Sequence, residues 1–301
     1  MTEFLQQLIN GLSLGAVYAL IALGYTMVYG ILRFINFAHS DVFMVGAFAG
    51  YYFSRFFHFP HESFGGGIAV TAMSMVACAA LGITIEKLAY RPLRLRKGSN
   101  LSVLITAIGV SLFLENAGQL VFGANFKPFP TLFPVHDFNT FGALHISSNQ
   151  LLVFGVTALL LISLQLIVLK TKIGTAMRAV SFNHLAASLV GINNDRIISF
   201  TFGLGSALAA AGGILYATLY PSIDPYMGVL PGLKAFVAAV LGGIGNIPGA
   251  ALGGLLLGLI ETFVNGSRFS TYTDAIAFAV LILILIFRPA GLLGKLQVEK
   301  V

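Results

Sequence analysis

The sequence predicts an all-α polytopic membrane protein, with about eight to ten membrane-spanning helices in one domain over residues 1–301. Hydrophobic residues make up 57% of the chain and charged residues only 9%, against about 45 to 50% and about 25% in soluble domains. The charged residues also gather in clusters that are separated by uncharged runs of about 20 residues, the length of helix that crosses a ~30 Å hydrocarbon layer. This number of charged residues is too small to cover the surface of a soluble protein. We therefore expect lipid to be the main solvent of the chain.

Other structural classes fit these observations poorly. The segment 151–169 is apolar on nearly all sides, whereas the strands of a membrane β-barrel alternate in polarity. The net charge of +6 is spread between hydrophobic runs, so it does not predict nucleic-acid binding. The single cysteine, Cys78, cannot form an internal disulfide. The first residues lack the positive region of a signal peptide, so we expect the first span to stay in the mature protein.

Nine apolar runs are candidate spans. In chain order they cover residues 8–30, 35–57, 67–88, 101–122, 151–169, 197–220, 229–245, 248–266 and 274–288. A glycine-rich stretch separates the seventh run from the eighth, so residues 229–266 predict either two spans or a broken, partly re-entrant pair. Small residues at Gly249, Gly253, Gly254 and Gly258 favour close helix packing.

Basic residues predict the orientation, because loops rich in Lys and Arg stay on the cytoplasmic side. Twelve of the 17 basic residues fall in three segments, which are 86–97, 170–196 and the tail from Arg288. The span count places all three on one side of the membrane. The N-terminus and the loops 58–66 and 123–149 then lie outside.

Two interruptions of the apolar pattern are candidates for a transport pathway. They lie at residues 33–41 and 242–249, one in each half of the chain. Paired broken segments are typical of transport pathways, and non-helical backbone at membrane depth must be buried in protein or line a wet cavity. Two ordinary tight turns between spans are an equally good interpretation.

No catalytic or metal-binding pattern is present in the sequence, so we expect no enzyme activity, no metal and no cofactor bound by this chain. His58, His61 and Glu62 come nearest to a cluster, and they fit a hydrated surface turn better than a metal site. The Gly294-Lys295 pair lacks the rest of a phosphate-binding loop. If ATP energises this protein, ATP and magnesium must therefore bind to separate subunits.

The polar segment 170–196 is predicted to form short cytoplasmic helices. Residues 175–180 are compatible with a helix, Asn183 can cap a second helix over 184–190, and Gly191 can end it. We expect Leu185, Leu189 and Ile192 to share one face of this helix. A two-turn helix is not stable alone, so it packs either on its own subunit or in the groove of a partner, and we favour the partner.

Four ionisable residues fall within or near the apolar runs. They are Asp41, Glu115, Lys234 and Glu261, which should face the bundle interior or lie near an interface. We expect Asp41 and Lys234 near the interfaces, and Glu115 to be the most buried. A hydrogen bond between helices is a better interpretation of Glu115 than a role in carrying protons.

Several segments match a known family. Residues 15–30 (GAVYALIALGYTMVYG), 35–39 (INFAH), 234–236 (KAF), 239–250 (AVLGGIGNIPGA) and the Gly191-Ile192 pair resemble the bacterial branched-chain amino acid ABC permeases. The resemblance covers nearly the whole chain and is strongest to the first of the two permease subunits of such an importer. Ser40 and Glu115 depart from the family pattern, where glycine and an uncharged amide are expected.

This resemblance implies a transmembrane domain of an ABC importer in the bacterial inner membrane, with a periplasmic N-terminus and a cytoplasmic C-terminus. Its implied partners are a second related permease, two cytoplasmic ATPase subunits and a periplasmic substrate-binding protein. The implied substrate path involves Asn36, His39, Asn246 and Glu115. The implied ATPase-coupling helix involves Asn183, Leu185, Ala186, Ala187, Leu189 and Gly191. A urea or short-chain amide permease of the same family and an ion-coupled secondary carrier are alternatives.

Overall fold

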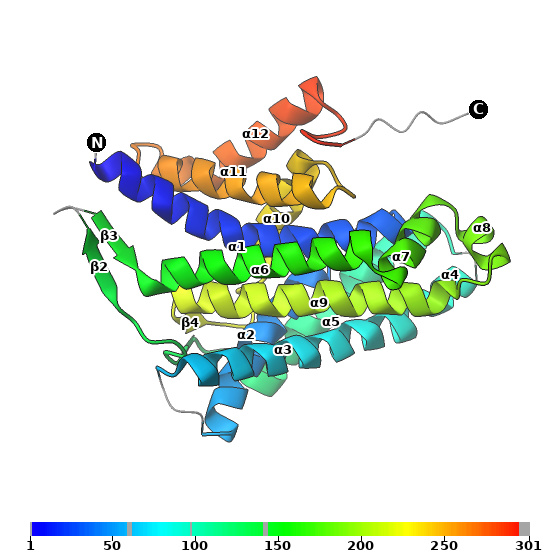
Figure 1. Ribbon diagram of the computed structural model, residues 1–301, viewed down its shortest axis with the longest axis horizontal. Coiled ribbons are helices and arrows are strands. Elements are labelled where there is room, and N and C mark those ends of the chain that lie inside the picture. Colours follow the sequence, from blue (N-terminus) through cyan, green and yellow to red (C-terminus); the bar gives the residue numbers. More distant parts are fainter. Residues whose placement is uncertain (1, 59–61, 97, 141–143, 295–301) are drawn as a thin grey trace.

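A computed structural model of the chain is a bundle of long helices (Figure 1), and it describes residues 2–58, 62–96, 98–140 and 144–294. The helices are α1 (Thr2–Leu32), α2 (His39–Phe56), α3 (Phe64–Ile85), the π-helix η1 (Glu86–Tyr90), α4 (Arg91–Leu95), α5 (Asn100–Phe122), α6 (Ser148–Lys170), α7 (Lys172–Phe182), α8 (His184–Leu189), α9 (Asn194–Leu219), α10 (Val229–Gly242), α11 (Ile247–Asn265), the 3-10 helix η2 (Ser270–Tyr272) and α12 (Thr273–Phe287). The all-α prediction is confirmed. His61 and Lys295 lie outside the described residues.

Four short strands complete the described part of the chain. Strand β1 (Lys127–Pro128) pairs antiparallel with β4 (Ser222–Ile223), with Lys127 opposite Ile223. Strand β2 (Asp137–Thr140) pairs antiparallel with β3 (Leu144–Ser147), with Asp137 opposite Ser147. Strands β1, β2 and β3 lie in the predicted loop 123–149, and β4 follows α9.

Seven helices among the described residues are long and apolar enough to cross a membrane. They cover Thr2–Leu32, Phe64–Leu95, Leu101–Phe122, Ser148–Lys170, Asn194–Leu219, Ile247–Asn265 and Ser270–Phe287. The two further runs that we counted as spans form α2 and α10. Helix α2 carries His39, Asp41 and Arg55 and is less apolar than the seven. Helix α10 has 14 residues and is about 21 Å long, which is short of a ~30 Å hydrocarbon layer.

Helices α1 and α9 form the centre of the bundle, and most of their residues are buried. Helix α11 lies against α1 at almost backbone distance. A Cβ atom on Gly254 would clash with the backbone of Ala19, and one on Gly258 would clash with the backbone of Gly15. The glycines that we expected to allow close packing therefore do so in α11.

The two ends of the bundle differ in structure (Figure 1). The hairpin of β2 and β3 lies at one end, beside the start of α1, where the side chain of Gln6 exchanges two hydrogen bonds of 2.9 Å with the backbone of His145. We call this the hairpin end. Helices α4, α7 and α8 lie at the opposite end, which we call the α8 end.

The basic segment 86–97 differs from our expectation of a connecting loop. Its residues Glu86–Leu95 continue α3 as the π-helix η1 and then as α4, and Pro92 stands in the first turn of α4. A π-helix inside a longer helix is uncommon and frequently marks a functional site.

Candidate functional site

The first interruption is a real break in the helical structure. Helix α1 ends at Leu32, and α2 begins at His39, so the break is narrower than the predicted 33–41. The chain turns at Arg33, which has a positive φ of 55°. We call residues 33–38 the break.

Asn36 and Ala38 of the break and the start of α2 are buried in the bundle. Asn36 is 5% exposed, and its Oδ1 accepts a hydrogen bond of 2.6 Å from the hydroxyl of Tyr90. His39 is 1% exposed and lies against the ring of Tyr25, with 4.7 Å between ring centroids. A Cβ atom on Gly24 would clash with the His39 ring, so the sequence of α1 makes room for the imidazole. Asn36 and His39, both predicted path residues, therefore occupy one buried region.

The start of α10 meets the start of α2 in this region. Side chains at Gly228 and Gly232 would clash with Ser40, so both positions need glycine. The hydroxyl of Ser40 donates a hydrogen bond of 2.8 Å to the carbonyl of Phe37. Sequence reasoning missed this meeting of two helix starts. Its signals were Asp224-Pro225 and Gly228, which lie between two of the predicted apolar runs.

The second interruption is a tight turn between α10 and α11. Asn246 caps α11 by accepting a hydrogen bond of 3.2 Å from the amide of Gly249, and its Nδ2 donates 2.7 Å to the carbonyl of Leu293. Both polar atoms of the Asn246 side chain are therefore bonded to backbone. The structure gives Asn246 a capping role.

The buried acidic residues are not the ones that we ranked first. Glu115 is only half-buried on α5, whereas Asp41 is 1% exposed and accepts a hydrogen bond of 2.5 Å from the hydroxyl of Ser111, one turn before Glu115. Lys234 is also buried, at 2.6 Å from Glu261 and 2.8 Å from Asp274. The expectation that Glu115 is the most buried is therefore wrong, and Asp41 and Lys234 face the bundle interior. Their expected place near the membrane interfaces stays a prediction.

The predicted coupling helix forms with the predicted caps. Asn183 Oδ1 accepts hydrogen bonds from the amides of Leu185 and Ala186 at 2.9 and 3.0 Å. Gly191 has a φ of 84°, and its amide bonds to Ser188 at 3.0 Å, so it ends α8 as expected. Ahead of it, α7 is longer than the predicted 175–180.

The two faces of α8 differ sharply in exposure. Leu185 and Leu189 are 71% and 79% exposed, and Phe182 and Val190, which flank α8 in the sequence, are also strongly exposed. We call these four residues the apolar patch. Ala187, in contrast, is 2% exposed and is bonded through its carbonyl to the amide of Ile192, which packs on the core. Ile192 therefore does not share a face with Leu185, and Ala187 faces its own chain.

The polar segment 170–196, which we call the coupling segment after its predicted role, is bonded to the last turn of α1. The hydroxyl of Ser181 donates to the carbonyl of Gly30, and His184 Nε2 lies 3.2 Å from the carbonyl oxygen of Ile31. The final carbonyls of a helix have no partner within it, so these contacts satisfy them from outside. They fasten the coupling segment beside the break.

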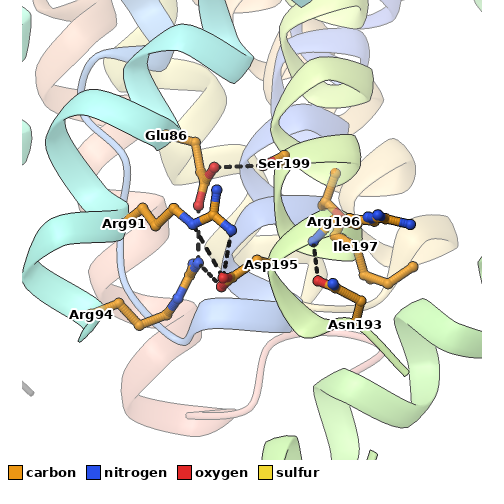
Figure 2. Close-up of polar contacts among 9 residues, drawn as sticks. Glu86, Arg91, Arg94, Asn193, Asp195, Arg196, Ile197 and Ser199 are labelled. Atoms are coloured by element: carbon orange, nitrogen blue, oxygen red, sulfur yellow. Dashed lines mark hydrogen bonds and ion pairs between the residues drawn. The ribbon is translucent and has the colours of Figure 1, made fainter. Parts of the chain in front are cut away.

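A group of charged residues fastens α9 to η1 and α4 at the α8 end (Figure 2). Asp195 accepts from Arg91 Nη2 at 2.5 Å and from Arg94 Nη2 at 2.6 Å. Arg94 also bonds Glu86 at 3.1 Å, and the other oxygen of Glu86 accepts 2.6 Å from the hydroxyl of Ser199. We call these five residues the charge cluster. Sequence reasoning used the arginines only to predict orientation and did not pair them.

Comparison with known proteins assigns a family. Residues 7–285 match the family described as branched-chain amino acid transport system / permease component. The chain is 45% identical to the high-affinity branched-chain amino acid transport system permease protein BraD of Pseudomonas aeruginosa, over 99% of this chain and 98% of the relative. It is 42% identical to the permease protein LivH of Escherichia coli K12, with the same coverage.

A second kind of relative is more distant. The chain is 26% identical to the permease protein LivM of Escherichia coli K12, over 93% of this chain and 68% of that relative. No solved structure matches the chain significantly. The family match spans nearly every helix described above, from α1 to α12. The chain therefore belongs to the permease component family of branched-chain amino acid transport systems.

Proposed function

We propose that this chain is a permease subunit of an ATP-driven importer that moves branched-chain and other hydrophobic amino acids across the bacterial inner membrane. The observation that carries this proposal is the apolar patch on a capped two-turn helix, α8, at one end of the bundle. An isolated helix of this length is unstable, and its exposed leucines fit a groove in another subunit. Family membership supports the substrate class, because BraD and LivH carry that substrate in their names.

The proposed partner at the α8 end is a pair of ATPase subunits, which bind and hydrolyse ATP with magnesium. This assignment makes the α8 end cytoplasmic and the hairpin end periplasmic, so the N-terminus is periplasmic. The basic residues of α4 and α7 agree with it, because cytoplasmic segments carry an excess of Lys and Arg. A periplasmic substrate-binding protein then docks at the hairpin end.

The second permease of the assembly is proposed to be a related chain. Two relatives of this protein, LivH and LivM of Escherichia coli, are both named as permease proteins of a branched-chain amino acid transport system. Similarity to both kinds of subunit supports a heterodimer of two related permeases.

The proposed mechanism is alternating access without covalent chemistry. Closure of the ATPase subunits displaces α8, and the path opens near the break, where Asn36 and His39 offer weak polar contacts to the zwitterion. Brief contacts suit a carrier because tight binding would trap the cargo. Glu115 stays a candidate beside Asp41, whereas the capping role of Asn246 makes it a weaker one.

Reconstitution tests this proposal directly. The chain is placed in vesicles with its related permease, the ATPases and the loaded binding protein, and uptake of labelled leucine, urea and acetamide is followed. We expect leucine uptake that depends on ATP. Uptake of urea or acetamide alone would reassign the substrate, and leucine uptake driven by an ion gradient without ATPases would reject the ATP-driven assignment in favour of a secondary carrier.

The patch itself is tested by Leu189→Ser, with Leu120→Ser on α5 as the matched control. Both side chains are strongly exposed, at 79% and 88%. We expect Leu189→Ser to reduce copurification of the ATPase subunits and Leu120→Ser to leave it unchanged. Equal copurification of the two variants would remove α8 as the docking element.

A further inference from the structure

A continuous series of polar contacts joins α8 to the break, and it runs through the charge cluster. We propose that the cluster and Tyr90 form a positioning device that carries a displacement of α8 to Asn36 in the break. This inference rests on the proposed function, because it assumes that partner subunits displace α8. It assigns to Asp195, Arg94 and Tyr90 a role in transport that is distinct from substrate contact.

The first step joins α8 rigidly to the start of α9. The amide of Ile192 bonds to the carbonyl of Ala187 at 3.1 Å, and Asn194 Nδ2 donates 2.8 Å to the carbonyl of His184. Asn193 then caps α9 by accepting from the amide of Arg196 at 3.1 Å (Figure 2). A movement of α8 therefore also moves the first turn of α9.

The second step passes through Asp195, in that first turn. Asp195 and Ser199 lie four residues apart and so share one face of α9. Arg94 bridges Asp195 to Glu86, and Glu86 returns to Ser199, which closes a ring of hydrogen bonds between α9 and the helix of η1 and α4. Glu86 is 0% exposed, and hydrogen bonds between charged groups are stronger than neutral ones. The ring therefore forces η1 to follow α9.

The ring also leaves one group in Arg94 unsatisfied. Arg94 Nη1 is buried and has no hydrogen-bond partner in the described part of the chain. A buried donor without a partner is unfavourable, so the ring does not satisfy every polar group that it encloses. A rearrangement of the ring that gave Nη1 a partner would therefore recover part of that cost.

The third step runs from η1 to the break. Tyr90 is the last residue of η1, it is buried, and its hydroxyl donates to Asn36. The Tyr90 ring also packs on Phe34, with 5.1 Å between centroids. A shift of η1 must therefore displace the break, while Ser181 and His184 hold the end of α1 on the other side of it.

The experiment uses the assembled transporter in vesicles and measures leucine moved per ATP hydrolysed. We expect Asp195→Asn to lower this ratio by about threefold to thirtyfold while ATP hydrolysis continues. Asp195→Glu should restore most of the ratio, because it keeps the charge. Arg196→Gln is the matched control, since Arg196 is exposed in the same turn and points away from the cluster in Figure 2.

A double-mutant cycle separates transmission from simple loss of packing. If the path is continuous, Tyr90→Phe and Asp195→Asn together should lower the ratio no more than the stronger single change. Independent, multiplicative effects or an unchanged ratio in Asp195→Asn would overturn the proposal. If the Asp195→Asn variant fails to assemble, Ser199→Ala takes its place in the cycle with Tyr90→Phe. The same two outcomes then support or overturn the proposal. ATP-driven leucine uptake by the unchanged transporter tests the proposed function separately.

Discussion

The two interruptions of the apolar pattern look alike in sequence, yet they are held in place by different parts of the molecule. Within the break at 33–38, Asn36 is bonded to Tyr90 of η1. Just before the break, the end of α1 is bonded to Ser181 of α7 and His184 of α8 through the carbonyls of Gly30 and Ile31. The turn between α10 and α11 is held by close backbone packing and by the Asn246 cap. Any displacement of an element that is bonded to a break acts on that break first. The first interruption is bonded to η1 and lies beside the end of α1 that the coupling segment holds. The second is bonded within its own helix pair and to Leu293, in the segment after α12, and has no hydrogen bond to η1 or the coupling segment in the described part of the chain.

The largest effect on stability is expected at the second turn. A Cβ atom on Gly242 would clash with the carbonyl of Gly249, and neither backbone can move aside. Gly242→Ala should therefore lower the free energy of unfolding by about 3 kcal/mol, the upper end of overpacking costs. Thermal unfolding in nanodiscs measures it, with Gly155→Ala as the control, since a Cβ there meets nothing within 4 Å. Equal melting temperatures for the two variants would contradict the account of a rigid second turn.

The next effect is expected at the first break. Tyr90→Phe removes the donor to the buried Asn36 and leaves its oxygen without that bond, at a cost of about 2 kcal/mol in unfolding free energy. Transport should fall as well, because the link between η1 and the break is lost. The same change at Tyr272, which is exposed, serves as the control in both assays. Wild-type uptake by Tyr90→Phe would show that this bond transmits nothing.

A third prediction compares the two asparagines. Asn246→Ala removes a helix cap and should cost about 1 kcal/mol in unfolding free energy, while uptake per folded molecule stays unchanged. Asn36→Ala should instead lower uptake per folded molecule. Uptake is normalised to the folded fraction in each case. Reduced normalised uptake in Asn246→Ala would return Asn246 to the substrate path.

The helices and some caps could be predicted from the sequence, but the contacts that hold the two interruptions could not. The nine apolar runs predict nine helices, and the caps at Asn183 and Gly191 are predicted correctly, because both depend on neighbouring residues. The contact of Tyr90 with Asn36 joins residues 54 apart, and that of Arg94 with Asp195 joins residues 101 apart. No local pattern specifies such pairs. The burial of Ala187 was missed for the same reason, since its neighbours come from the fold and not from α8.

The smallest effect on stability is expected at the apolar patch. Leu185→Ser changes an exposed side chain, so the free energy of unfolding should shift by less than about 0.5 kcal/mol. ATP-dependent uptake should nevertheless fall, because the proposed partner loses an apolar contact. A marked loss of thermal stability would show that Leu185 packs on its own chain.

The accessibility of a single cysteine at each interruption shows whether ATP acts on the break and not on the second turn. The native cysteine is first removed by Cys78→Ala. Ile35→Cys then places a thiol in the break, and Ile244→Cys places one in the second turn. The two sites are matched, because both carry a partly buried isoleucine. The rate of labelling by a small thiol reagent is measured in the assembled transporter, with the ATPases nucleotide-free and ATP-bound. We expect ATP to change the labelling rate several-fold at residue 35 and to leave it unchanged at residue 244. Equal changes at both sites, or a change at residue 244 alone, would contradict this expectation.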